Sequence, residues 1–308
     1  MNEELLRFHP RVGDQLARRE AASGHIPYEY TDEIIIAVNA ALATQRPLLL
    51  RGAPGSGKST LARDVALALD LSFDEKVITS RTSAADLLWT FDAVRRLSDT
   101  QPDPNLARNP SNYVERGVLW NAFERGVLST NGIVVLLDEI DKADPDVPND
   151  LLVPLGERRF DVTDARPKIT VKQEREVFVI ITTNGERELP PAFLRRCASL
   201  TLDDPSRDPK RLEAIARRHL AAMYEPRAAP APALDTGLLA AIVKRVDDLA
   251  PKIETATYRR AGTAEILDAF KACLELGFQL GTQDWNALTS MMLVKDGRAL
   301  EPEKATKP

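Results

Sequence analysis

The sequence has 308 residues, 44% of them hydrophobic and 28% charged, which is the composition of a globular protein with one large core and a smaller second one. Its 41 basic and 46 acidic side chains leave a net charge of −5, which gives no general attraction to the phosphate backbone of a nucleic acid. Two cysteines and three scattered histidines argue against a disulfide framework or an imidazole-based metal site. No apolar stretch is long enough to span a membrane, and the charged N-terminus lacks a signal-peptide pattern, so we expect a cytoplasmic protein.

The first part of the chain predicts helices and strands in alternation. Apolar residues at helical spacing indicate a helix over residues 31–44, with Thr31 as its N-cap. The apolar run at residues 48–50 indicates a buried strand that ends on a glycine-rich turn, and a helical pattern resumes at Ser59. The following stretch predicts an amphipathic helix over residues 83–96, an exposed loop over 97–112 and another helix over 113–128.

Two further apolar runs have the character of central strands in a parallel sheet. Residues 133–137 are closed by Asp138 and Glu139, and residues 177–181 are closed by two threonines and Asn184. Short alternating segments at residues 159–162 and 168–172 predict a hairpin before the second of these strands. Strands alternating with helices indicate a parallel sheet between helical layers, an αβα sandwich of the α/β class.

Strand signals stop after Pro205, and the rest of the chain is mostly helical in pattern. Helices are predicted over residues 209–224, 236–249 and 263–280. We therefore predict four parts: an N-terminal extension (1–25), an α/β domain (26–203), a smaller all-helical domain (204–296) and a disordered tail (297–308).

The strongest motif is a phosphate-binding loop. Residues 52–59 fit the pattern GxxxxGK[ST] and lie between a predicted strand and a predicted helix. Glycines let backbone N–H groups close on an anion, and the helix N-terminus adds its positive end. We expect Lys58 to neutralise the β- and γ-phosphates of ATP, Ser59 to coordinate Mg²⁺ and Thr60 to contact the α-phosphate. The predicted binding residues are Gly52, Pro54, Gly55, Ser56, Gly57, Lys58, Ser59 and Thr60.

A second group of polar residues lies at the ends of the predicted strands. Asp138 is positioned to hold Mg²⁺ through water, and Glu139 to orient and deprotonate an attacking water. Such a pair is otherwise a solvated turn or a helix cap, but the phosphate loop favours the functional interpretation. Asn184 is a candidate polar sensor of the γ-phosphate, and with Gly185 it also fits an Asn-Gly turn. Arg195 and Arg196 end a predicted short helix, and paired arginines are usually a solvated face.

Together these residues resemble the AAA+ superfamily of ATPases and, within it, the MoxR family. The resemblance covers residues 26–295 and rests on RGAPGSGKSTLA, VVLLDEIDKADPDV, the hairpin GERRFDV with ITVKQEREVFVIITTN, and LPPAFLRRC. It implies a helical lid domain, Mg²⁺ binding by Asp138, water activation by Glu139 and a sensor role for Asn184. It also implies that Arg196, or the adjacent Arg195, reaches the nucleotide of a neighbouring subunit.

The resemblance is imperfect at one position and open at another. The family's second sensor is an arginine that opens a lid helix, but Ala264 occupies that position, so Arg259 or Arg260 substitutes or the function is missing. Residues 82–92 resemble a family insertion that faces the ring pore. There Trp89 and Phe91 either grip a client protein or pack on neighbouring helices.

The function expected from these observations is ATP hydrolysis by a homo-oligomer, a hexameric ring by the family's habit, that remodels a protein partner. The resemblance implies a partner with a von Willebrand factor A domain. Two alternatives remain: a nucleotide-controlled assembly switch in a signalling or defence complex, and a motor or loader acting on DNA. The acidic balance disfavours the second of these.

Overall fold

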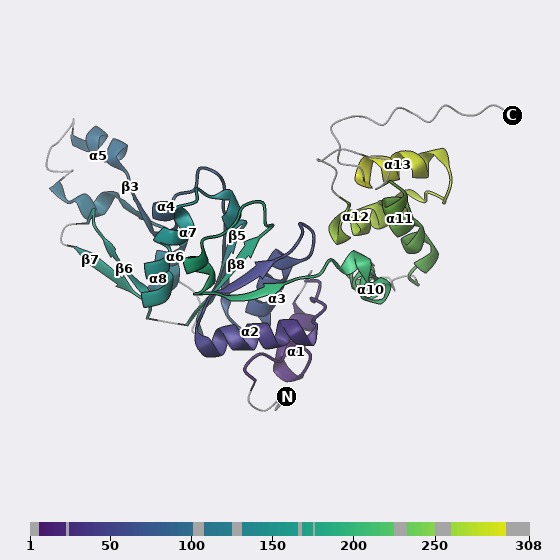
Figure 1. Ribbon diagram of the computed structural model, residues 1–308, viewed down its shortest axis with the longest axis horizontal. Coiled ribbons are helices and arrows are strands. Elements are labelled where there is room, and N and C mark those ends of the chain that lie inside the picture. The colour runs from purple at the N-terminus through teal and green to yellow at the C-terminus, as the bar shows by residue number, and fades with distance from the viewer. Residues whose placement is uncertain are drawn as a thin grey trace. The chain divides into compact units, whose positions relative to one another are not determined.

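The computed structural model describes residues 6–22, 25–100, 108–124, 131–165, 168–174, 176–224, 233–249 and 260–293. The chain divides into two compact units (Figure 1). The first consists of Met1–Ser23, Tyr30–Gly52 and Gly57–Leu202, and the second of Gly24–Glu29, Ala53–Ser56 and Asp203–Pro308. The N-terminal residues, predicted as an extension, therefore count with the first unit, and the predicted tail lies outside the described residues.

The core of the first unit is a five-stranded sheet in which every pairing is parallel. In spatial order its strands are β2 (Ser72–Val77), β5 (Ile133–Asp138), β8 (Val177–Thr183), β1 (Leu48–Arg51) and β9 (Ala198–Thr201). The three strands predicted from apolar runs, β1, β5 and β8, occupy the centre, which confirms the parallel α/β sheet. The two edge strands were not predicted, because β2 is half polar and β9 has four residues of mixed character.

Helices cover both faces of this sheet. On one face lie α2 (Asp32–Thr44), which contacts β1 and β9, and α3 (Lys58–Leu69), which contacts β2, β5 and β8. As predicted, Thr31 caps α2 by accepting a hydrogen bond from the Ile34 amide at 3.4 Å. Further out, α1 (Gly13–Ala21) packs on α3. The N-terminal segment is therefore part of this layer.

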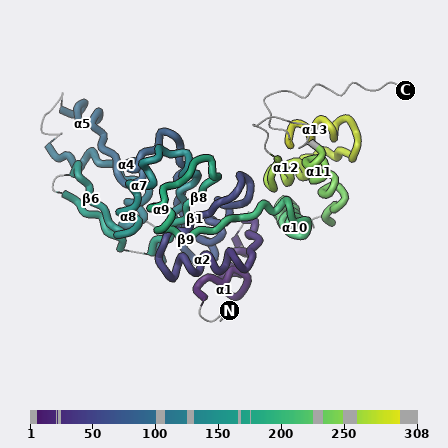
Figure 2. Tube along the Cα trace, in the orientation of Figure 1, coloured from purple at the N-terminus to yellow at the C-terminus, as the bar shows by residue number. Residues whose placement is uncertain are grey.

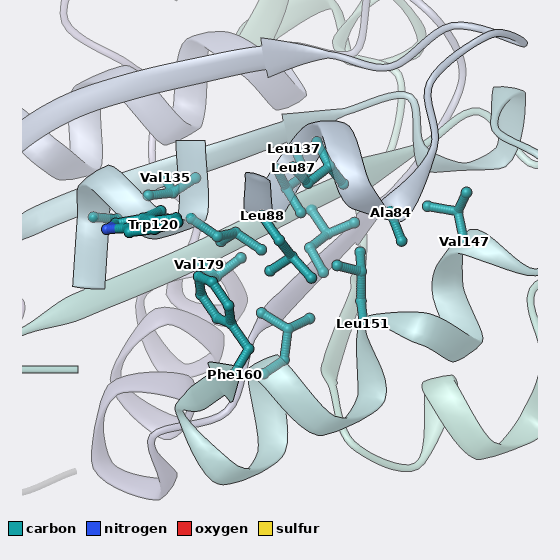
Figure 3. Packing of buried hydrophobic residues seen from close by; sticks show 14 of the residues in the cluster. Ala84, Leu87, Leu88, Trp120, Val135, Leu137, Val147, Leu151, Phe160 and Val179 are labelled. Atoms are coloured by element: carbon teal, nitrogen blue, oxygen red, sulfur yellow. The ribbon is translucent and has the colours of Figure 1, made fainter. Parts of the chain in front are cut away.

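The other face carries a large apolar cluster (Figure 3). Val135 and Leu137 of β5 and Val179 of β8 lie in this cluster with Trp120 of α6 and Phe160 of β6, and the two β5 residues are two apart, as the period along a strand requires for one face. The elements of this layer are α4 (Ala84–Leu88), α6 (Val118–Phe123), η4 (Ile140–Lys142), α7 (Val147–Asp150), α8 (Leu152–Glu157) and α9 (Pro191–Leu194). The predicted hairpin forms from β6 (Arg159–Val162) and β7 (Ile169–Lys172), which pair antiparallel.

The single helix predicted over residues 83–96 is interrupted in its middle, and helical structure resumes at Ala93. Ser83 caps α4 in a reciprocal arrangement with Asp86, but the helix ends at Leu88. The next residues form β3 (Trp89–Phe91), which pairs antiparallel with β4 (Val114–Arg116), and α5 (Ala93–Thr100) follows. The helix predicted over 113–128 is replaced at its start by the turn η3 (Pro110–Tyr113) and β4. Aromatic and β-branched residues favour the strand, and long-range pairing decides it.

The described part of the second unit is helical, as predicted. It contains η5 (Pro205–Arg207), α10 (Pro209–Tyr224), α11 (Thr236–Leu249), α12 (Thr263–Leu276) and α13 (Gln283–Leu293). These helices share a core of their own, which includes Leu212, Ile242 and Phe270. Helix α12 stops four residues before the predicted end because Gly277 adopts a left-handed conformation with φ 66°. None of the described helices has the length and apolar character needed to cross a membrane.

Candidate functional site

The phosphate loop connects the carboxyl end of β1 to the amino end of α3. Gly57 is the N-cap of α3 and has φ 89°, a left-handed conformation that glycine adopts without steric cost. Gly55 is also at positive φ, 82°. The helix begins at Lys58, so the amides of its first turn have no partner within the helix and face the loop. The local geometry is that of an anion cradle.

Three side chains form a continuous hydrogen-bond chain beside this cradle. Lys58, which is 6% exposed, donates through Nζ to the Gly52 carbonyl and to Asn184 Oδ1, each at 2.8 Å. The Asn184 amide donates through Nδ2 to Glu139 Oε1 at 2.9 Å. Asn184 therefore links the cradle lysine to the candidate base. Asn184 directly follows β8 and Glu139 directly follows β5, and the two strands are neighbours in the sheet.

Ser59 and Asp138 converge beside that chain. Ser59 Oγ lies 3.1 Å from Asp138 Oδ1 and 3.0 Å from Oδ2. A hydroxyl and one carboxylate are hard oxygen donors, and Mg²⁺ is usually held by one or two carboxylates together with substrate phosphates. The residues therefore fit this metal. In the described part of the chain, no group of three or more His, Cys, Asp and Glu side chains is arranged to hold a metal by itself.

Thr182 and Asp141, which the sequence did not single out, hold these groups in place. The buried Thr182 hydroxyl donates to Asp138 Oδ1 and accepts a hydrogen bond from the Glu139 amide at 2.8 Å. The Asp141 carboxylate is 3% exposed and accepts from the amides of Asn184, at 3.4 Å, and Glu186, at 2.9 Å. The turn after β8 is thus fixed to the turn after β5. Asp141 follows the Asp-Glu pair at a spacing of two, but its partner is visible only in three dimensions.

Glu139 occupies a strained position and has a second partner. Its backbone is left-handed, with φ 62° and ψ 50°, directly after β5. Lys142 donates through Nζ to Glu139 Oε2 at 2.6 Å, and this hydrogen bond raises the pKa of Lys142. One oxygen of Glu139 therefore bonds to Asn184 and the other to Lys142. Both oxygens of the carboxylate are thus hydrogen-bonded beside the cradle.

Arg195 and Arg196 lie at the amino ends of the strands, whereas the cradle lies at their carboxyl ends. They come just before β9, whose first residue, Ala198, donates its amide to the Pro47 carbonyl at 2.9 Å. Pro47 precedes β1 and the cradle follows it, so the two are separated by the strand, roughly 16 Å at a rise of about 3.3 Å per residue. Both arginines are exposed. A single subunit therefore does not bring them together with its own Lys58.

The second-sensor candidates are only partly described. Arg259 and its position lie outside the described residues. Arg260 donates through Nε to Asp247 Oδ1 at 3.0 Å and through Nη1 to Ser206 Oγ at 2.6 Å, and its guanidinium lies 3.6 Å from Asp204. It is therefore engaged within the helical unit. Ala264, in the first turn of α12, provides no charge.

The aromatic residues of the insertion pack rather than stand free. Trp89 stacks on Phe160 with ring centroids 5.7 Å apart, and its Nε1 donates to Asp164 at 3.0 Å. The guanidinium carbon of Arg96 lies over the Phe91 ring, 5.8 Å from the ring centroid. For Trp89 the packing alternative is the one that the structure supports.

Comparison with known proteins agrees with this geometry. Residues 47–197 match the AAA domain of the dynein-related subfamily. The chain is 31% identical to the chaperone protein ClpB of Propionibacterium freudenreichii over 186 residues, which cover 59% of this chain and 19% of that protein. It is 28% identical to midasin of Giardia intestinalis over 200 residues, 63% of this chain and 4% of that protein. The chain thus spans less than a fifth of these two relatives.

Two other likenesses extend the comparison. A shikimate kinase of Shewanella pealeana is 30% identical over 157 residues, which are 44% of this chain and 91% of that enzyme. The crystal structure of NtrX from Brucella abortus in complex with ADP superposes with a TM-score of 0.53 at 12% identity, covering 86% of this chain and 54% of that one. The second likeness concerns the fold alone. With the parallel sheet and the cradle, the match identifies residues 47–197 of this chain as an AAA domain with a P-loop.

Proposed function

We propose that this chain is a Mg²⁺-dependent ATPase of the MoxR type, which works as a ring and remodels or activates a protein partner. The observation that carries the proposal is the hydrogen-bond chain from Lys58 through Asn184 to Glu139, next to the Ser59–Asp138 pair. A lysine, a metal-binding pair and a carboxylate are then all within reach of one terminal phosphate. NtrX has been seen with ADP, which supports nucleotide binding by a similar fold.

Each residue has a role that its position supports. Lys58 and the loop amides bind the phosphates, and Ser59 with Asp138 would hold Mg²⁺, which supplies charge neutralisation on the phosphates when bound. Glu139 takes the proton of the attacking water, and Asn184 orients Glu139 through its amide. Thr182 keeps Asp138 and the Glu139 backbone in register. The proposed hydrolysis therefore relies on the start of α3 and on residues at the carboxyl ends of β5 and β8.

The position of the two arginines supports the proposed ring. Arg195 and Arg196 lie at the amino ends of the strands and the cradle at their carboxyl ends. They can therefore contact a nucleotide only when it is bound to another copy of the chain. An arginine supplied in this way stabilises negative charge on the phosphoryl group being transferred. A head-to-tail interface generates a closed ring when its rotation closes, and six subunits is the number implied by the family resemblance.

The partner is proposed on weaker grounds, from likeness. ClpB is named as a chaperone, which supports action on proteins. A partner with a von Willebrand factor A domain follows from the MoxR resemblance. Pull-down with the Glu139→Gln variant and ATP, which holds the nucleotide-bound state, tests this directly.

The test of the ATPase itself uses the same substitution. The parent protein should release phosphate from ATP in the presence of Mg²⁺ and stop when the metal is chelated. Glu139→Gln should bind ATP with unchanged affinity by calorimetry and lower kcat by about 10²- to 10⁴-fold, the usual contribution of a general base. Glu157→Gln, an exposed carboxylate paired with Arg159, is the matched control. If the Glu139→Gln protein hydrolyses ATP at the parent rate, Glu139 is not the general base.

A second candidate is a nucleotide-controlled switch in which turnover is incidental. It is favoured by the ion pair of Glu139 with Lys142 and by the engagement of Arg260 inside the helical unit. A switch stays active on its partner when Glu139→Gln is bound to ATP, whereas a remodelling enzyme does not. The likeness to a kinase adds one measurement: ADP formation that requires an added hydroxyl compound and releases no inorganic phosphate would reassign the reaction to phosphoryl transfer onto that compound.

A further inference from the structure

A pocket of about 250 Å³ in the first unit is rich in arginine. Arg46, Arg158, Arg195 and Arg196 line it, and its lining contains no aspartate or glutamate. In the part of the chain that the structure describes, none of these four guanidinium groups forms an ion pair with a carboxylate. In a chain of net charge −5, four guanidinium groups without a carboxylate partner concentrate positive charge around one pocket. A bound anion would relieve their mutual repulsion.

Three segments far apart in the sequence build this pocket. Arg46 lies between α2 and β1, Arg158 ends α8, and Arg195 and Arg196 follow α9 (Figure 2). Arg158 donates through Nη2 to the Gln45 carbonyl at 2.9 Å, which joins the first two segments.

The third segment is joined by close packing and by backbone geometry. A Cβ built on Gly156 of α8 would lie 3.5 Å from Arg196 Nε, so this side chain runs along the end of α8. Arg158 is in the left-handed region, with φ 55°, a conformation that a non-glycine residue rarely adopts. The fold thus holds Arg158 in a sparsely populated conformation at the pocket wall. This conformation is common where a helix ends, and it places Arg158 directly after α8 at the pocket wall.

We propose that the four arginines form one phosphate-binding pocket, in which Arg46 and Arg158 act with Arg195 and Arg196 on the terminal phosphate of a nucleotide held by a second copy of this chain. The inference rests on the proposed function. Guanidinium groups bind phosphate oxygens in pairs and keep their charge at any working pH, so several of them around one phosphate give both strength and orientation. The pocket is at the amino end of β1 and the cradle is at its carboxyl end. The pocket of one copy can therefore contact only the cradle of another copy.

The first test measures assembly without hydrolysis. In the Glu139→Gln background, ATP with Mg²⁺ should drive self-association, followed by sedimentation velocity. Adding Arg158→Gln or Arg46→Gln should shift the midpoint of this association to at least tenfold higher protein concentration. ATP affinity of the dilute subunit, measured by calorimetry, should stay within twofold, because neither arginine contacts its own cradle.

The second test asks whether Arg158 acts across the interface. Subunits carrying Arg158→Gln have an intact cradle, and subunits carrying Glu139→Gln have an intact pocket. Mixing the two should restore turnover above the mean of the separate samples, because the pocket of one serves the cradle of the other. If Arg158 has a merely structural role, the turnover of the mixture should equal the mean of the two separate samples.

The controls separate folding from function. Arg159→Gln alters the next residue, which is exposed, pairs with Glu157 and does not line the pocket, and it should change neither assembly nor turnover. Arg158→Lys keeps a cation and should recover part of the association. Arg46 is exposed and its side chain forms no hydrogen bond or ion pair among the described residues, so Arg46→Gln tests the pocket even where Arg158→Gln lowers stability.

The outcomes are distinguishable. If ATP binds and drives association, but neither Arg46→Gln nor Arg158→Gln weakens it, the pocket has no such role and the proposed ATPase is unaffected. If calorimetry detects no ATP binding by the folded parent, the proposed function fails and the pocket proposal fails with it.

Discussion

Lys142 donates a hydrogen bond through Nζ to Glu139 Oε2 at 2.6 Å, across three residues of chain. The pair holds the candidate base in one orientation and competes with an attacking water for the same oxygen. Lys142 is 40% exposed, and exposed ion pairs are worth about 0.2–1 kcal/mol. We therefore predict that Lys142→Met raises kcat for ATP by up to about fivefold, measured as phosphate release at saturating nucleotide. A tenfold fall would show instead that Lys142 positions Glu139 for the reaction.

Thr182 should matter for stability as well as for the site. Its hydroxyl serves both Asp138 and the Glu139 amide, and its side chain is fully buried. Thr182→Val keeps the shape and leaves two half-buried polar groups without this partner, which costs about 1–3 kcal/mol in the free energy of unfolding. Urea denaturation measures this difference. Thr170→Val, on the exposed face of β7, should change it by less than about 0.5 kcal/mol.

The N-terminal segment is attached to the first unit through a buried ion pair. Arg19 and Asp64 are 2% and 0% exposed, and Asp64 Oδ1 also accepts from the Tyr30 hydroxyl at 2.7 Å. Arg19→Met leaves this carboxylate buried without its cation and should cost about 3–5 kcal/mol. Removing both charges, as Arg19→Met with Asp64→Leu, should recover much of the loss. Equal destabilisation by the single and double variants would contradict this explanation.

The thiol of Cys197 should be inert in the folded protein. Burial raises its pKa to about 12, although the nearby Arg51 and Arg46 lower it. At pH 8 only about 10⁻⁴ of the thiol is then ionised. The rate of alkylation by iodoacetamide should therefore be set by the rate at which the protein unfolds. The raised pKa also has a stability consequence. Between the ordinary thiol pKa of about 9 and the folded value the unfolded chain alone loses the proton, so the free energy of unfolding falls with pH in that window, and Cys197→Ala removes this part of the fall.

The centre of the sheet could be predicted because β1, β5 and β8 are continuous apolar runs that end on polar residues. The cradle could be predicted because its chemistry lies in eight consecutive residues. The edge strands β2 and β9 carry no such signal, since one side of an edge strand meets solvent. The hairpin of β3 and β4 depends on pairing across more than twenty residues, which no local pattern reports.

The same distinction applies within the site. Glu139 and Asn184 are recognisable because each closes a strand, but the lysine bound to Glu139 and the threonine behind Asp138 are defined by contacts alone. Arg195 and Arg196 stand together in the sequence, whereas Arg46 and Arg158 join them only when three segments meet. The roles of all these residues stay predictions until the variants are measured.

The strand β1 has a further consequence through its polarity. Its four residues separate the arginine-lined pocket at its amino end from the phosphate loop at its carboxyl end. If the proposed ring forms, it is directional: each subunit would sense the nucleotide of the neighbour on one side and present its own nucleotide to the neighbour on the other. Events at one nucleotide would then travel round the circle in a single rotational sense.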